Sequence, residues 1–245
     1  MFNVQTLIDE IVVKNNQTKS GKRDKANFHV SDAGTCYRKR YYKRLGIKAT
    51  ADIPVANLRK MLAGDAGHTQ LQWLLKRNGN LVASEGEVKV PHVVGHFDAI
   101  IKEGGTKTLL EIKTIEKFQA SWIKKSGAKP EHKMQMFSYW TMLRQDYKDL
   151  DNAVLTYVKR EDFEANDYYF KWDESITEQV HNEWAPLIKM WEEGVLPECT
   201  CKLDYGGAGP KYCRYSTSDT ECCSEILYAH MVAEEEKPIV ANVMN

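Results

Sequence analysis

The sequence predicts an α/β (α+β) domain in which a central mixed sheet is flanked by helices. Apolar residues recur at helical spacing at both ends of the chain's core, and short, partly alternating apolar segments lie between them. The chain has 245 residues, of which 42% are hydrophobic and 28% charged. These fractions are typical of globular proteins and argue against disordered and fibrous classes. No run approaches the ~18 apolar residues of a membrane span and no signal-peptide pattern opens the chain, so we expect a cytoplasmic protein without a membrane segment.

Residues 1–54 predict a helical amino-terminal region. A helix is expected over residues 2–16, because apolar residues recur there at helical spacing, and a polar, Lys-rich loop follows it. Ser31-Asp32 is a suitable N-cap for a second, short helix, which would hold Cys36 and the basic run over 37–44.

The core of the domain is expected over residues 55–195, and a cysteine-rich carboxyl-terminal region and tail are expected over residues 196–245. In chain order, the core is expected to contain a helix over 55–77, strand segments over 81–90, 93–102 and 107–113, helices near 116–125 and 130–146, strands at 153–159 and 167–172, and a helix over 174–193. Gly104-Gly105 predicts a hairpin turn between the second and third strand segments.

Charge is segregated along the chain, although the totals of 34 basic and 34 acidic residues balance. The segment 14–48 contains 11 Lys and Arg against 2 Asp, whereas the segment 161–200 contains 11 acidic residues against 2 Lys. A basic segment of this size can hold a phosphate backbone, and solvated helix faces are the simpler alternative. Tyrosines are interleaved with the cations that we expect to contact single-stranded DNA, namely Arg38, Arg40, Lys43 and Arg44.

Two carboxylates and a lysine lie in apolar surroundings on adjacent predicted strands. Asp98 is in GHFDAII (95–101), and Glu111 and Lys113 are in LLEIKT (109–114). Residues two apart in a strand point to one face, so Glu111 and Lys113 project together, and the hairpin brings Asp98 beside them. Paired carboxylates suit a hard cation such as Mg²⁺, and the lysine can hold a water or stabilise charge on a phosphate. Ordinary turn and edge residues are the alternative, but charges buried without a partner are costly.

These segments resemble the PD-(D/E)XK nuclease signature in its RecB-like branch, which has a restriction-endonuclease-like core. Gly64 to His68 resembles the G-x-x-x-H motif of that branch, and Gln135 with Tyr139 resembles its Q-x-x-x-Y motif, in the same order along the chain. The resemblance implies a Mg²⁺ or Mn²⁺ site formed by His68, Asp98, Glu111 and Ile112. The catalytic residues that it implies are Asp98, Glu111, Lys113, Gln135 and Tyr139.

The six cysteines are placed unevenly, with one at position 36 and five within residues 199–223. Clustered thiols in a reducing compartment indicate metal or iron–sulfur ligation. The pattern resembles the subgroup whose [4Fe–4S] cluster ties the two chain ends together, as in CRISPR-associated adaptation exonucleases and phage-type exonucleases. Ser216 stands where the usual C-x2-C-x5-C run has its middle cysteine, so one ligand must come from elsewhere. The implied ligands are Cys36, Cys201, Cys213 and Cys222, with Cys199 and Cys223 as alternates, and Zn²⁺ is the alternative to the cluster.

The resemblance implies a metal-dependent DNA nuclease that acts as an exonuclease on single strands or free ends, and the basic, tyrosine-rich run suits single-stranded DNA. Such an enzyme would process DNA ends in recombination or replication, in a bacterial or phage-infected cell, with replication or recombination proteins as further partners. The main alternative is a catalytically weak nucleic-acid-binding or assembly module with a nuclease fold, against which the intact set of Asp98, Glu111 and Lys113 argues. A restriction-type endonuclease is a third alternative, but no specificity domain is visible in the sequence.

Overall fold

The computed structural model describes residues 3–201 and 213–216. The chain divides into two compact units, one formed by Met1–Gly34 with Ile53–Lys189 and the other by Thr35–Asp52 with Met190–Asn245. The second unit therefore combines a segment near the start of the chain with a segment near its end.

The first unit holds both sheets and most of the helices. In chain order, the elements of the chain are α1 (Val4–Lys22), β1 (Phe28–His29), the 3₁₀ turn η1 (Val30–Asp32), α2 (Tyr37–Leu45), α3 (Val55–Arg77), β2 (Leu81–Ser84), β3 (Glu87–Val90), β4 (Val93–His96), β5 (Ala99–Glu103), β6 (Thr106–Ile115), α4 (Lys117–Ser126), α5 (Pro130–Leu143), β7 (Asn152–Lys159), β8 (Ala165–Lys171) and α6 (Glu174–Glu192). Of these, α2 belongs to the second unit. The predicted fold class, a mixed α/β arrangement with flanking helices, is confirmed.

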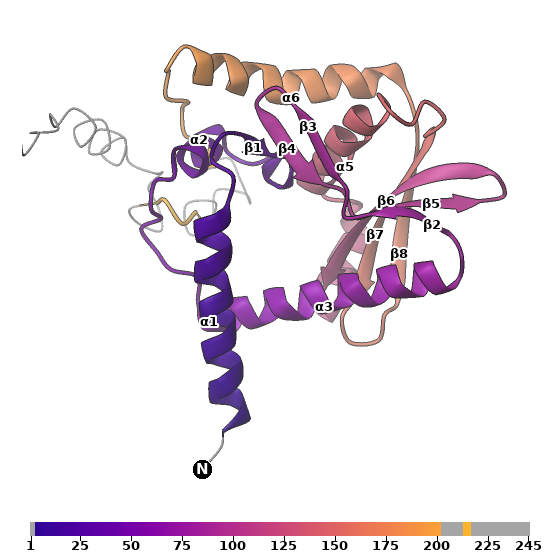
Figure 1. Cartoon of the computed structure of the whole chain (residues 1–245), viewed down its shortest axis with the longest axis horizontal. Coiled ribbons are helices and arrows are strands. Elements are labelled where there is room, and N and C mark those ends of the chain that lie inside the picture. The colour runs from indigo at the N-terminus through magenta and orange to yellow at the C-terminus, as the bar shows by residue number, and fades with distance from the viewer. Residues whose placement is uncertain (1–2, 202–212, 217–245) are drawn as a thin grey trace, which may run out of the picture. The chain divides into compact units, whose positions relative to one another are not determined.

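Two mixed sheets form the frame of the first unit (Figure 1). The larger sheet has the strand order β2-β5-β6-β7-β8, in which β6 and β7 are parallel and the other neighbours are antiparallel. The smaller sheet has the order β1-β4-β3, in which β1 is parallel to β4. β6 is the central strand of the larger sheet, and its residues from Leu109 to Ile115 are buried or half-buried.

Successive side chains of β6 point to opposite faces of the larger sheet. Leu110 and Ile112 pack into an apolar cluster to which Leu71 and Leu75 of α3 also contribute. The intervening residues Glu111 and Lys113 point to the opposite face, which α5 covers. Figure 1 shows α3 and α5 on opposite sides of the larger sheet.

The predicted hairpin joins β5 to β6. Gly104 and Gly105 have φ values of 55° and 90°, as a two-residue hairpin turn with two positive φ angles requires, and Glu103 pairs with Thr106 across it. This turn sets the register that brings the start of β5 beside the middle of β6.

The strand segments expected over 81–90 and 93–102 are each divided in the structure. β2 and β5 pair in the larger sheet, whereas β3 and β4 pair in the smaller one, so each segment changes sheets near its middle. Glu85, at the first change, has a φ of 53°. The first change falls in the polar residues Ser84 to Glu87, which the sequence analysis did not interpret as a break between two strands.

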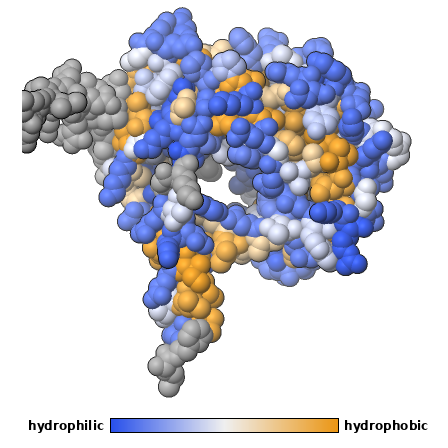
Figure 2. All heavy atoms as spheres, viewed as in Figure 1, coloured by the Kyte–Doolittle hydropathy of each residue, from blue (hydrophilic) through white to orange (hydrophobic). Residues whose placement is uncertain are grey.

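The helical start of the chain differs in two details from the prediction. α1 continues to Lys22, well beyond residue 16. Cys36 is the N-cap of α2, whereas Ser31-Asp32 lies in the 3₁₀ turn η1. Figure 2 shows apolar side chains along α1, where Val4, Leu7 and Ile11 are exposed. No helix in the described ranges has both the length and the apolarity needed to cross a membrane.

Candidate active site and cysteine centre

Asp98 is held against the backbone of β6. It directly precedes β5, whose Ala99 pairs with Leu110 on β6. Asp98 Oδ2 accepts a hydrogen bond of 2.6 Å from the N–H of Ile112. This bond fixes the carboxylate next to Glu111, so the strand pairing places the two acidic residues in one site.

The carboxyl group of Glu111 is buried, with only 1% of the residue exposed. Its Oε1 lies 2.7 Å from Lys113 Nζ, whereas its Oε2 has no hydrogen-bond partner among the described residues. Burial, followed by the negative charge of Asp98, raises the pKa of Glu111 to about 7, although Lys113 opposes the change. A buried oxygen without a donor, beside a second carboxylate, is an arrangement that a cation would stabilise.

Lys113 is held between two acceptors. Glu111 Oε1 lies at 2.7 Å and Gln135 Oε1 at 2.8 Å from its Nζ. Gln135 and Tyr139 are one turn apart on α5. Burial, and then the charge of Glu111, raise the pKa of the Tyr139 hydroxyl, which therefore stays protonated at neutral pH. Gly95 on β4 leaves room for this ring, since a Cβ there would lie 2.6 Å from Tyr139 Cε1.

His68 reaches the same site from α3. Its Nδ1 lies 3.6 Å from Asp98 Oδ1. Burial disfavours the charged imidazole, but the interaction with the Asp98 carboxylate outweighs it and raises the pKa of His68. Two glycines let α3 approach β6 closely: a Cβ at Gly64 would lie 3.0 Å from Thr114 Oγ1, and one at Gly67 would lie 2.9 Å from Thr114 Cγ2.

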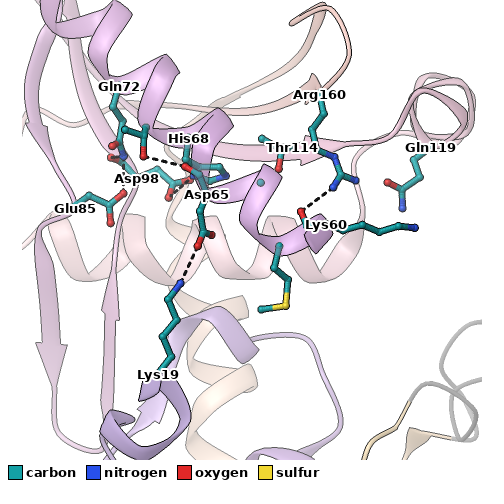
Figure 3. Close-up of a pocket in the computed structure, with 13 residues that line it drawn as sticks. Lys19, Lys60, Asp65, His68, Gln72, Glu85, Asp98, Thr114, Gln119 and Arg160 are labelled. Atoms are coloured by element: carbon teal, nitrogen blue, oxygen red, sulfur yellow. Dashed lines mark hydrogen bonds and ion pairs between the residues drawn. The ribbon is translucent and has the colours of Figure 1, made fainter. Parts of the chain in front are cut away.

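A cleft of about 790 Å³ opens beside Asp98 and His68 (Figure 3). Polar and charged side chains from α1, α3, α4 and the β7–β8 turn line it, among them Lys19, Lys60, Gln119 and Arg160. Glu111 and Lys113 are not among the lining residues, because Glu111 is buried. The cleft therefore gives access to the site from its Asp98 side.

Gln72 and Glu85 also line the cleft, and the sequence analysis missed both. Gln72 Nε2 donates to Glu85 Oε1 at 2.6 Å and to the carbonyl oxygen of Asp98 at 3.1 Å. The positive φ of Glu85 is uncommon for a residue other than glycine and is typical of functional positions. Gln72 follows His68 by four residues on α3, and this spacing is the signal that would have found it.

The donors in this site fit a hard divalent cation. Asp98 and Glu111 offer carboxylate oxygens, and His68 offers an imidazole nitrogen. Mg²⁺ and Mn²⁺ favour carboxylate ligands and keep some of their waters, for which the adjoining cleft has space.

The basic run on α2 differs from the DNA-contacting surface that the sequence analysis expects. Arg38, Arg40 and Arg44 are buried, with 7%, 2% and 7% of their surfaces exposed, and Lys43 is half-buried. Arg40 donates to the carbonyl oxygen of Thr35 through Nε at 2.9 Å and Nη2 at 2.7 Å. Their charge led us to expect exposed side chains, but the fold buries these three arginines.

Two of these arginines contact the carboxyl-terminal segment of the second unit. Arg38 Nε donates to the carbonyl oxygen of Pro197 at 2.6 Å. The guanidinium of Arg44 lies 3.9 Å from the ring centroid of Trp191, a cation–π distance. These contacts connect α2 to the end of α6 and to the segment that follows it. They give the buried guanidinium groups of Arg38 and Arg44 a hydrogen-bond and a cation–π partner.

Three cysteines form one group in the second unit. The Sγ atoms of Cys36, Cys199 and Cys201 all lie within 4.8 Å of one another, at 3.9 Å between Cys36 and Cys199 and 2.9 Å between Cys199 and Cys201. Cys213 is buried in the same apolar cluster as Cys36 and Cys201. Cys199, which the sequence analysis gives as an alternate ligand, is thus within the group. Cys222 and Cys223 lie outside the described residues.

The two chain segments around these thiols are also joined by hydrogen bonds to backbone carbonyls. Thr50 donates to the carbonyl oxygen of Arg214 through its N–H at 2.9 Å and its hydroxyl at 2.7 Å, and the hydroxyl lies 2.9 Å from the carbonyl oxygen of Ser216. Clustered, buried thiols are suitable ligands for either Zn²⁺ or an iron–sulfur cluster. The donor set therefore fits a thiolate-bound metal centre.

No protein-family model matches the sequence, and no curated protein matches it. Among solved structures, SSO0001 is similar, with a TM-score of 0.53 and 19% identity, covering 77% of this chain and 87% of that one. This likeness shows a shared fold. An alkaline exonuclease from Laribacter hongkongensis has a TM-score of 0.49 and 12% identity, covering 69% of this chain and 89% of its own. A phage-related exonuclease from Haemophilus somnus has a TM-score of 0.37 and 12% identity, covering 54% and 71%.

Proposed function

We propose that the chain is a metal-dependent DNA nuclease that hydrolyses phosphodiester bonds, and that it acts as an exonuclease on single strands or free ends. The observation that carries the proposal is Glu111. Its buried carboxylate has one oxygen paired with Lys113 and one without a donor among the described residues, beside the carboxylate of Asp98. Such a group is costly for folding alone, and a cation would compensate for it.

The residues divide the work of hydrolysis among them. Asp98, Glu111 and His68 would hold Mg²⁺ or Mn²⁺, which polarises a phosphoryl oxygen and lowers the pKa of water when bound. Lys113 donates a hydrogen bond to the attacking water or to the phosphate oxygen on which negative charge develops. Its ammonium has three N–H donors, of which two are directed at Glu111 and Gln135. Gln135 positions Lys113 by accepting one of its hydrogen bonds.

Cleavage of end-labelled DNA tests this proposal. Single- and double-stranded oligonucleotides should be degraded with Mg²⁺ or Mn²⁺ and remain intact in EDTA. Asp98→Asn should lower cleavage by at least ~10²-fold, the scale of losing a metal ligand or a charge stabiliser. Asp149→Asn, which changes an exposed carboxylate paired with Lys107, is the matched control and should cleave as wild type does. Metal-dependent cleavage that survives in Asp98→Asn would contradict the assignment.

We also propose that the cysteines bind a [4Fe–4S] cluster, with Zn²⁺ as the alternative ion. The proposed ligands are Cys36, Cys201, Cys213 and Cys222, with Cys199 and Cys223 as alternates. Anaerobically purified protein should be brown and should contain iron and sulfide, and Cys36→Ser should be colourless. Colourless protein with one tightly bound zinc per chain would keep the thiolate centre and reject the cluster.

A further inference from the structure

Helix α4 exposes two aromatic side chains on one face. Phe118 is 70% exposed and Trp122 is 54% exposed. They are four residues apart in a helix, so they lie next to each other on its surface. Single exposed apolar residues are ordinary, but two adjacent large aromatic side chains are typical of a binding surface.

The surroundings of this pair are basic. The sequence of α4, KFQASWIKKS, contains three lysines and no acidic residue. Lys117, Lys124 and Lys125 are exposed. Beyond the helix, Lys129 Nζ lies 5.9 Å from the ring centroid of Trp122. Protein–protein interfaces are usually depleted in lysine, whereas aromatic faces among cations are typical of surfaces that bind single-stranded nucleic acid.

The helix begins at the edge of the candidate active site. α4 starts two residues after β6, the strand that carries Glu111 and Lys113. Gln119, directly after Phe118, lines the cleft beside Asp98 (Figure 3). Gln119 and Glu116 also form a capping box, in which the side chain of each accepts from the backbone of the other. This box fixes the first turn of the helix, so Phe118 is held on an ordered element next to the cleft.

We propose that Phe118 and Trp122 form a stacking platform for unpaired bases of the DNA strand that enters the cleft. Each base stacks on an aromatic face, and Lys117, Lys124 and Lys125 neutralise the phosphates between them. This inference rests on the proposed nuclease function. It places the bound DNA strand along α4, because the arginines of α2 are buried.

Binding of a fluorescein-labelled oligothymidylate in EDTA tests the platform without cleavage. The double variant Phe118→Leu/Trp122→Leu keeps apolar side chains that favour a helix and removes both aromatic faces. Its affinity should fall by about 10-fold for each aromatic ring removed, or about 100-fold in total. The slope of log affinity against log salt should stay that of wild type, because the lysines remain. Tyr169→Leu, which removes an exposed aromatic residue from β8, is the control and should bind as wild type does.

A second variant tests the phosphate-binding lysines. Lys124→Gln/Lys125→Gln should reduce that salt slope by about 0.7 for each phosphate of a single strand that is no longer neutralised. Wild-type binding by the leucine variant would overturn the platform, while metal-dependent cleavage by the same protein would leave the nuclease function standing. A leucine variant that changes the oligomeric state but not DNA affinity would overturn it in favour of a protein-binding surface. A wild-type protein that neither binds nor cleaves DNA would overturn both proposals.

Discussion

Glu111→Gln should change how the stability of the metal-free protein depends on pH. The substitution keeps the shape of the side chain but removes its ionisation. Glu111 is the group to change because it is buried and its pKa is raised to about 7, first by burial and then by the charge of Asp98. Its folded state therefore binds a proton more tightly than the unfolded state, in which the pKa is 4.5.

The magnitude follows from that difference in pKa. The extra stability that the protonated group confers is fully present below the unfolded pKa and is lost as the pH rises through the folded pKa. The free energy of unfolding should thus fall by about 3 kcal/mol between pH 4.5 and a pH above 7, and most of the loss should occur between pH 5 and 8. For a chain of this size, that loss corresponds to a decrease of roughly 6–12 °C in Tm.

Urea unfolding followed by tryptophan fluorescence, in EDTA at pH values from about 5 to 8, measures the effect. The wild type should lose stability over this range, and Glu111→Gln should lose about 3 kcal/mol less. Glu103→Gln, which changes an exposed carboxylate on β5 of the same sheet, should follow the wild-type profile. Any part of the pH dependence that comes from His68 remains in this control. Identical profiles for the wild type and Glu111→Gln would refute the argument that burial of this carboxyl is costly.

The same experiment with Mg²⁺ or Mn²⁺ tests what compensates for that cost. A cation favours the ionised carboxylate, so it should stabilise the wild type more at about pH 8 than at about pH 5. The stabilisation should be much smaller in Glu111→Gln, which offers only an amide oxygen. Equal stabilisation of both proteins would place the cation elsewhere.

Three further outcomes are expected. Gly67→Ala should lower the free energy of unfolding in urea by about 1–3 kcal/mol, because the new Cβ would lie 2.9 Å from Thr114 Cγ2. Adding Thr114→Ser, which removes that methyl group, should recover most of the loss. A Gly67→Ala variant as stable as the wild type would contradict the close packing. Cys201→Ser should lose bound metal, measured by elemental analysis, as fully as Cys36→Ser does, and full retention would exclude Cys201 as a ligand. Thr50→Val should cost about 1–2 kcal/mol, since it removes the hydroxyl that donates to the carbonyls of residues 214 and 216, and faster amide exchange confined to the second unit should show it.

The sequence was most informative where one regular pattern decides the structure. Alternation alone places Glu111 and Lys113 on one face of β6, and two consecutive glycines can adopt the positive φ angles of a hairpin, so the register that brings Asp98 to Ile112 could be predicted. The bounds of α3 were also predictable, because its apolar spacing ends at Asn78-Gly79.

Other features depend on contacts between distant segments, and composition does not reveal these. The change of sheet lies in the polar residues Ser84 to Glu87, but a short polar stretch does not show that the strands on its two sides belong to different sheets. Arg38 and Arg40 look like surface cations in sequence, but both are buried and donate to backbone carbonyl oxygens inside the second unit. Gln72 carries no charge and belongs to no recognised motif, and only its spacing of four residues from His68 points to its contacts with Glu85 and the backbone of Asp98.

The glycines explain why the motif residues meet at one place. A helix that packs on a sheet through ordinary side chains lies about 10 Å from it, and small residues at the contact let the helix approach more closely. Gly67 has no side chain to separate α3 from Thr114 of β6, so the helix lies close to the strand there. The next residue, His68, lies 3.6 Å from Asp98. Gly95 does the same for Tyr139 at β4. The glycines in the two motifs are therefore requirements of packing, and the ligands beside them are positioned by that packing on regular elements, where a metal site can be held with little reorganisation.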